Sequence, residues 1–129
     1  MFSTASATSC KGLTMDSTYF YTACSTSSRV VRIHRTTFVV EDLSVSDLSF
    51  SAISNSIVAQ DPDNDGRAEV LWVQGLDDRV YICEPSEAGP YFVQDFALNL
   101  DNTYGLDIDQ LNNVLWMFDD SPNELFRLD

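Results

Sequence analysis

The sequence has few basic residues. Seven lysine and arginine residues stand against 20 aspartate and glutamate residues, which gives a formal net charge of −13, and Lys11 is the only lysine. Nucleic acids and anionic membranes bind basic surfaces, so this charge argues against both as partners. No apolar run approaches the roughly 18 residues of a membrane-spanning helix. The amino terminus shows neither the basic start nor the apolar stretch of a signal peptide.

Cysteines are also scarce. Cys10, Cys24 and Cys83 are an odd number without C-x-x-C spacing, which argues against a disulfide framework and against a zinc site. Free cysteine is often buried, so we expect three small core residues, with a Cys10–Cys24 bridge as the alternative. Apolar residues make up 44% of the 129 residues, enough for the core of one domain or of part of a larger one.

Three copies of one pattern follow each other along the chain. Residues 20–33 align with residues 70–83 without a gap at an offset of 50. Residues 114–128 follow the second copy at an offset of 44, which rises to 45 after one inserted residue. Each copy is an apolar, β-rich run, a polar turn and a second β-rich run, which is typical of a β-hairpin.

Further strands flank these hairpins. We expect a first strand before each hairpin and a fourth strand after two of them, over residues 12–16, 56–61, 105–109, 38–43 and 91–96. Four antiparallel strands repeating every 44–50 residues have the period of a β-propeller blade. The sequence therefore predicts an all-β fold, a single partial β-propeller of three four-stranded antiparallel blades over residues 1–129. Its parts are a leader strand (1–10), blade one (11–50), blade two (51–100) and blade three (101–129), which lacks its outer strand.

These repeats resemble those of known propeller families. Residues 105–109, Gly-Leu-Asp-Ile-Asp, and the hairpin over 114–129 are similar to the repeat of the NHL, YVTN and six-bladed lactonase-like propellers. Residues 29–38 have the same character, and the resemblance extends over nearly the whole chain. It implies a propeller fold and leaves the function open, because propellers host unrelated activities.

The number of blades suggests assembly. A closed ring needs about four to eight blades, and the end blades of an open array need polar caps that neither end of this sequence provides. We therefore expect two chains to form a six-bladed ring, in which each leader strand completes the partner's third blade. The alternatives are docking onto different chains, or that this sequence is a piece of a longer propeller.

Residues 61–69 form the clearest ligand-binding pattern. Calcium takes six to eight oxygen ligands, which alternate side chains of a tight loop can supply. Asp61, Asp63 and Asp65 would each offer a carboxylate, Arg67 its backbone carbonyl and Glu69 a final carboxylate, while Gly66 allows the sharp turn. The twelfth position, which is Glu in an EF-hand, is Trp72 here, so an EF-hand is excluded.

This acidic loop lies between the first and second expected strands of blade two. The pattern D-x-D-x-D-G-x-x-E at that place resembles the loop of FG-GAP and VCBS-type blades, as in integrin heads. The resemblance implies one structural Ca²⁺ per chain, because the other two copies lack the acidic cluster. The alternative is an ordinary acidic surface turn.

Other repeated positions have simpler explanations. Trp72 and Trp116 are equivalent, with Thr22 at that position in the first copy, and we expect them to fill space between blades rather than to stack on a sugar. Asp16, Asp61 and Asp109 end the first strand of each blade. The resemblance to lactonase-like propellers implies that they could ring a central opening and bind a metal, but an Asp there more often begins the turn by accepting backbone hydrogen bonds. His34, the only histidine, has no neighbouring acid and nucleophile that would make it catalytic.

The sequence favours a non-enzymatic binding or assembly module. We expect a calcium-stabilised partial propeller that acts in adhesion, as a scaffold or on a particle surface, with homodimerisation favoured and carbohydrate unsupported as a ligand. Acidity and a calcium site favour an extracellular or particle-surface location. The alternative function is a small lactonase-like hydrolase with a metal at the centre of the assembled ring.

Overall fold

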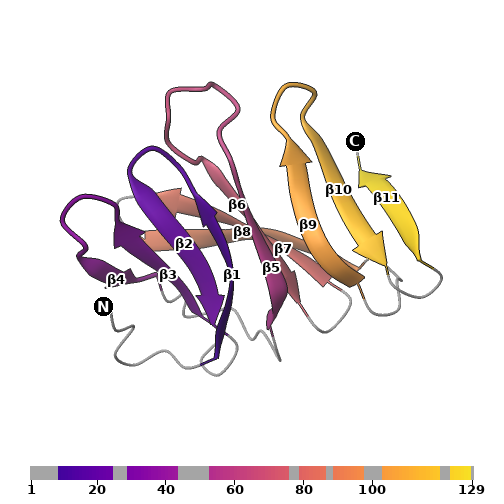
Figure 1. Ribbon diagram of the computed structural model, residues 1–129, viewed down its shortest axis with the longest axis horizontal. Coiled ribbons are helices and arrows are strands. Elements are labelled where there is room, and N and C mark those ends of the chain that lie inside the picture. The colour runs from indigo at the N-terminus through magenta and orange to yellow at the C-terminus, as the bar shows by residue number, and fades with distance from the viewer. Residues whose placement is uncertain are drawn as a thin grey trace.

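The chain is built of antiparallel β-strands. The computed structural model describes residues 9–24, 29–43, 53–75, 79–86, 89–97, 103–119 and 123–128. Within these residues, eleven strands lie in three sheets, and strands consecutive in the chain are neighbours in each sheet (Figure 1). The predicted all-β class is thereby confirmed. None of the described residues forms a helix that is long and apolar enough to cross a membrane.

The three sheets follow the three repeats of the sequence. Sheet A contains β1 (Cys10–Met15), β2 (Tyr19–Cys24), β3 (Arg29–His34) and β4 (Val40–Asp42). Sheet B contains β5 (Ile53–Gln60), β6 (Val70–Gly75), β7 (Arg79–Ser86) and β8 (Gly89–Ala97). Sheet C contains β9 (Thr103–Asp109), β10 (Val114–Asp119) and β11 (Glu124–Leu128).

The ends of the predicted units differ in detail. Residues 1–8 of the expected leader strand lie outside the described residues, and Cys10, placed in the leader, belongs to β1. The fourth strand of the first unit is shorter than expected, because Phe38 has a φ of 60° and belongs to the turn before β4. Left-handed backbone at a non-glycine residue marks a turn and ends an extended strand.

The sheets stack in the order A, B, C. Side chains along a strand point alternately to the two faces of its sheet, so sheet B can contribute side chains to two cores. One core joins sheet A to sheet B and includes Tyr21, Ala23 and Val30 against Leu71 and Val73. The second core joins the other face of sheet B to sheet C. It contains Val58, Trp72, Val80, Leu106, Ile108, Leu115, Met117, Phe126 and Leu128.

Each sheet therefore has two faces with different roles. We call the face toward the preceding sheet the N-side face and the face toward the following sheet the C-side face. Leu71 and Val73 lie on the N-side face of sheet B, and Trp72 lies on its C-side face. The first strands of the three sheets, the edge strands β1, β5 and β9, are neighbours in this stack (Figure 1).

The strand pairing corrects the alignment of the first repeat. In sheet B, Leu71 is opposite Cys83, whereas in sheet A the residue opposite Ile33 is Phe20. The gapless offset of 50 therefore holds for β3 but is wrong by one residue in β2. A one-residue slip exchanges the two faces of a strand, so Tyr21, not Thr22, occupies the position of Trp72. Tyr21 packs toward sheet B just as Trp72 packs toward sheet C.

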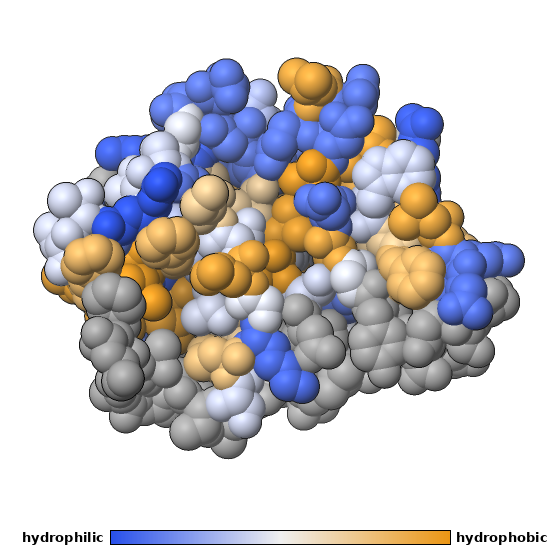
Figure 2. Space-filling view, in the orientation of Figure 1, coloured by the Kyte–Doolittle hydropathy of each residue, from blue (hydrophilic) through white to orange (hydrophobic). Residues whose placement is uncertain are grey.

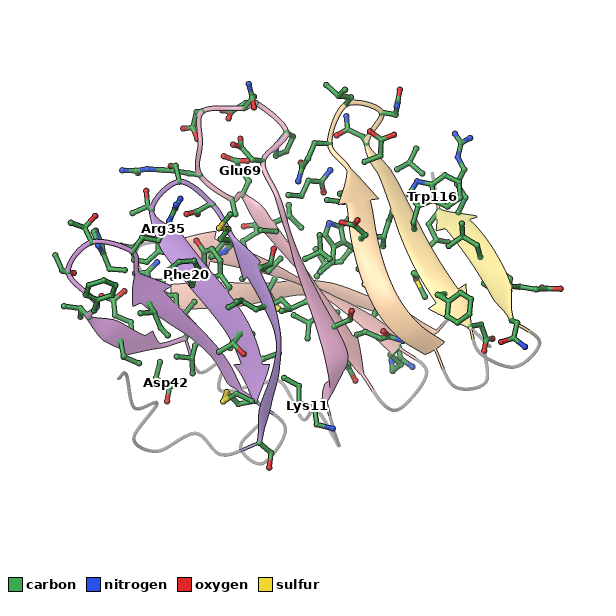
Figure 3. The ribbon with its side chains drawn as sticks, viewed as in Figure 1. Lys11, Phe20, Arg35, Asp42, Glu69 and Trp116 are labelled. Atoms are coloured by element: carbon green, nitrogen blue, oxygen red, sulfur yellow. A yellow bond between two sulfur atoms is a disulfide. The ribbon has the colours of Figure 1, made fainter. Side chains whose placement is uncertain are left out.

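The two tryptophans lie in different surroundings despite their equivalent positions. Trp72 packs in the core between sheets B and C, and its Nε1 donates a hydrogen bond to Gln60 Oε1 at 2.8 Å, which confirms the expected packing role. Trp116 lies on β10 at the end of the stack (Figure 3). It is half-buried on the C-side face of sheet C, opposite to the face that carries Leu115 and Met117.

The cysteines are only partly as expected. Cys10 and Cys24 are directly opposite each other in β1 and β2, with Cα atoms 3.8 Å apart, and they form a disulfide. The expectation of three free thiols is wrong for this pair, because the strand register brings together two residues separated by 14 positions. Cys83 is free and fully buried, and burial raises the pKa of its thiol to about 12.

Met117 tests the stacking of sheet C on sheet B. Its side chain is fully buried between the two sheets, so Met117→Ala leaves a cavity. We expect this variant to have a free energy of unfolding about 2–5 kcal/mol lower than that of the wild type, as measured with urea. Leu111→Ala is the control, because Leu111 is 95% exposed in the β9–β10 turn, and this change should stay within about 0.5 kcal/mol. Equal stability of the two variants would contradict this packing.

Candidate functional site

The acidic loop joins β5 to β6, as the sequence predicted. It runs over residues 61–69 and rises above the stack, with hydrophilic side chains gathered over it (Figures 1 and 2). Asn64 and Gly66 have φ values of 59° and 92°, so the chain turns sharply twice. Gly66 also lies close to sheet A. A Cβ atom at this residue would be only 2.8 Å from Ser17 Oγ. Both the conformation and the close approach require glycine there.

Backbone hydrogen bonds hold the aspartates of this loop. Asp61 accepts from Asp65 N through Oδ1 at 3.1 Å and from Gly66 N through Oδ2 at 2.8 Å. Asp63 Oδ1 accepts from Asp65 N at 3.0 Å, and Asp65 Oδ1 accepts from Arg67 N at 2.8 Å. The loop thus fixes three carboxylates before any ligand binds.

Four carboxylates converge here. Asp61, Asp63, Asp65 and Glu69 each offer one oxygen within 4.8 Å of the others, and Figure 3 shows Glu69 beneath the loop. The four predicted carboxylates are therefore brought together by the fold. Carboxylate oxygens in a tight loop suit a hard divalent cation such as Ca²⁺ or Mg²⁺. The predicted role of the Arg67 carbonyl as a ligand stays a prediction.

Burial and the close approach of the other carboxylates disfavour the charged form of Glu69. Its Oε2 atom is buried and accepts no hydrogen bond from the described residues. Burial raises the pKa of Glu69, and the charges of Asp63, Asp61 and Asp65 raise it further. A bound cation would supply the missing partner and offset the repulsion among the four carboxylates.

The loop also ties the three sheets together. On one side, Ser17 N donates to Gly66 O at 2.8 Å and Ala68 N donates to Asp16 Oδ2 at 3.1 Å, which links the loop to the β1–β2 turn. On the other side, Gln110 in the β9–β10 turn accepts from Asp61 N at 3.2 Å and donates to Ala59 O at 2.9 Å. The candidate cation site is thus the place where sheets A, B and C are linked by polar contacts.

The recurring aspartates begin turns, as expected. Asp16 Oδ1 accepts from Thr18 N at 2.7 Å and from Tyr19 N at 2.6 Å. Asp109 Oδ1 accepts from Leu111 N at 3.1 Å and from Asn112 N at 3.2 Å. Together with Asp61, these residues accept backbone N–H groups of their own turns, which confirms the turn-forming interpretation.

Asp16 has a second role that the sequence did not reveal. Its Oδ2 accepts from Tyr21 OH at 2.7 Å as well as from Ala68 N, so it joins the core of sheet A to the acidic loop. Partial burial raises the pKa of Asp16, but hydrogen bonds from Tyr19 N, Tyr21 OH, Ala68 N and Thr18 N outweigh this and lower it below 3.8. The contact to Ala68 spans 52 positions, which no local pattern can announce.

A cavity of about 520 Å³ lies beside the loop, between sheets A and B. It is lined by two aromatic rings of sheet A, Tyr19 and Tyr21, and by carboxylates from both sides, Asp16, Glu69 and Glu84. Arg32 is also in the lining, with its guanidinium 4.5 Å from the centre of the Tyr19 ring. The rings of His34 and Tyr19 are nearly perpendicular, with their centres 5.3 Å apart. His34 Nδ1 accepts from Thr36 N and Thr37 N at 3.2 Å, so this histidine holds the turn after β3.

Comparisons with known proteins support the fold. No family model matches the sequence, and no curated protein matches it either. A chain in the crystal structure of the nidogen/laminin complex matches this structure with a TM-score of 0.63 at 12% sequence identity. The match covers 93% of this chain and 48% of that chain. The likeness shows a β-propeller-like fold, and this chain spans about half of the structure it matches.

The contacts of Asp16 predict a pH-dependent contribution to stability. A carboxyl with a lowered pKa stabilises the fold above its unfolded value of 3.8 and loses that effect as the pH falls through its folded value. We expect Asp16→Asn to lower the free energy of unfolding, measured with urea at neutral pH, by about 1 kcal/mol. The effect is this small because the site is partly exposed to solvent. The difference from the wild type should vanish in acid.

Asp107→Asn is the control for this experiment. Asp107 is exposed on β9, and its Oδ1 accepts a hydrogen bond from the adjacent Ile108 N. Because Asp107 is exposed, Asp107→Asn should change the free energy of unfolding by no more than about 0.5 kcal/mol at neutral pH. A difference between Asp16→Asn and the wild type that persists below the folded pKa would contradict the proposed role of the charge.

Proposed function

We propose that this chain is a non-enzymatic binding and assembly module, a partial β-propeller whose protein partners complete the ring. The observation that carries this proposal is the structural match, which covers 93% of this chain but 48% of a propeller-like chain. The three sheets of this chain stack on one another in the same manner as the sheets of a propeller. Among possible partners we favour a second copy, since two such halves would make a ring of six sheets, within the usual range of four to eight.

The acidic loop is the proposed structural metal site. Asp61, Asp63, Asp65 and Glu69, with the carbonyl of Arg67, would hold one Ca²⁺ per chain in the manner of FG-GAP and VCBS-type blades. Calcium is favoured over magnesium because it accepts a crowded and flexible set of carboxylates, whereas magnesium keeps several waters and demands octahedral geometry. The unpartnered Oε2 of Glu69 supports this assignment.

The cation would act on the whole stack. Because the loop hydrogen-bonds to the turns of sheets A and C, rigidity gained at residues 61–69 would also fix the ends of β1 and β9. Any ligand that binds only the folded chain adds to its stability. The site is therefore proposed to set the shape of the module rather than to perform chemistry.

The surroundings of the module follow from the same features. The disulfide between Cys10 and Cys24 and the calcium site favour an extracellular or particle-surface location, where thiols are oxidised. The net charge of −13 argues against nucleic acid as a partner. A lactonase-like hydrolase is less well supported, because Asp16, Asp61 and Asp109 are engaged as acceptors in their own turns.

Calcium titration tests the proposed function. We expect one Ca²⁺ per chain in isothermal titration calorimetry, and a gain of about 2–3 kcal/mol in unfolding free energy at a hundredfold excess over Kd. EDTA should reverse the gain. Asp63→Asn and Glu69→Gln should each abolish most of it, because each removes a charged ligand.

Glu124→Gln is the matched control. Glu124 is an exposed carboxylate on β11, so its variant loses one negative charge outside the loop and should bind calcium like the wild type. If calcium leaves stability unchanged, or if Glu124→Gln lowers its effect as much as Asp63→Asn, the loop is an ordinary acidic turn.

A further inference from the structure

Exposed apolar side chains occur on the first and last sheets of the stack and in their turns. Among the side chains that the structure describes, which exclude those of β8, the large hydrophobic residues with high exposure all belong to sheets A and C or their turns. They are Leu13, Met15, Phe38, Val39, Val40, Leu111, Phe118 and Leu125. Large exposed apolar patches at the surface of a soluble protein mark interaction sites.

At one end lies the C-side face of sheet C. Phe118 is directly opposite Leu125 across β10 and β11, so the two side chains share a face, and they are 40% and 63% exposed. Trp116 is on the same face of β10 two residues away. In sheet B the equivalent face carries Trp72 and Val80, and sheet C covers it.

At the other end lies the N-side face of sheet A. Met15 is opposite Phe20, and Phe20 is opposite Ile33, so the three residues form a row across β1, β2 and β3. Met15 is 58% exposed, while Phe20 and Ile33 are half-buried. The register makes Phe20 and Ile33 the counterparts of Leu71 and Cys83, which sheet A covers in sheet B.

The two open faces are therefore of opposite kinds. Twice within the chain, a C-side face packs on an N-side face: sheet A on sheet B, and sheet B on sheet C. The stack ends with an N-side face on sheet A and a C-side face on sheet C. A third junction of the same kind needs one face from each end.

We propose that the C-side face of sheet C in one copy docks on the N-side face of sheet A in a second copy, and that two such junctions close the dimer. This inference rests on the proposed assembly function and specifies its geometry. A head-to-tail contact closes into a ring when its rotation returns to the start, and two halves of a six-sheet ring meet that condition. It excludes a dimer in which like faces meet, A on A or C on C.

The disulfide lies on the same face of sheet A but beside the proposed docking surface, because Cys24 and Val31 are already buried in the single chain. Cys10 and Cys24 pack with Val31 and Ile33 on the N-side face of sheet A. The covalent link holds β1 against β2 at the end of this face opposite to Met15, and the register shift between Lys11 and Thr14 separates the two parts. The disulfide thereby fixes the strand that carries Met15.

Charge substitutions on the two faces test this geometry. Met15→Lys and Leu125→Glu change residues that are exposed in the single chain, so both variants should fold, as circular dichroism can verify. The wild type should have the mass of two chains in native mass spectrometry and in light scattering. Each variant alone should be monomeric, with a dimer dissociation constant raised about a hundredfold, because an unpaired charge is buried at both junctions.

Mixing the two variants separates the arrangements. A Met15→Lys chain keeps its sheet C face and a Leu125→Glu chain keeps its sheet A face, so an equimolar mixture should recover a one-to-one dimer through an intact junction. Contacts between like faces predict instead that only one of the two variants loses the dimer and that mixing restores nothing. Leu111→Glu is the control, because Leu111 lies in a turn outside both faces and should leave the dimer intact.

Each other result would overturn the inference. A monomeric wild type would exclude the second copy as the occupant of these faces, and a dimer that survives Met15→Lys or Leu125→Glu would place the contact elsewhere. The calcium titration remains a separate test of the module itself. A monomer that binds one Ca²⁺ would overturn this docking geometry and leave the metal site standing.

Discussion

The alternation of side chains along each strand is the constraint on which the rest of the structure depends. Sheet B is covered on both sides, so its strands must supply apolar residues to two cores at once. Leu71 and Val73 pack toward sheet A, and Trp72 between them packs toward sheet C. A slip of one residue in this strand would exchange the two cores, so the stacking fixes the register of the whole sheet.

Polar contacts then bind the stacked sheets at one edge. The β5–β6 loop forms hydrogen bonds with the turns on either side. It bonds to Ser17 and Asp16 in the β1–β2 turn of sheet A and to Gln110 in the β9–β10 turn of sheet C. The same loop carries four carboxylates close together, which repel one another. The fold thus places this repulsion where hydrogen bonds link the three sheets, and a cation bound there would act on all three sheets.

The sequence predicted what is local and missed what depends on distant contacts. The hairpins were predicted correctly because a strand, a turn and a returning strand are encoded in adjacent residues. The slip at Tyr21 was not visible, because aligning two hairpins without a gap gives no information on which face meets the next sheet. The disulfide of Cys10 and Cys24 and the bridge from Asp16 to Ala68 likewise follow from register and stacking. The acidic loop was found because its residues lie within nine positions, whereas the cavity beside it combines two sheets.

The charge of the chain acts against its association. Two copies with a net charge of −13 each repel one another, so a docked pair must gain more from its apolar faces than it loses to this repulsion. Phe118, Leu125 and Met15 provide such faces at opposite ends of the stack. A divalent cation in each acidic loop would remove two negative charges from each copy and weaken the repulsion directly. The proposed metal binding and the proposed docking would therefore be coupled through electrostatics even though the loop lies outside both docking faces, and screening by salt would act in the same direction.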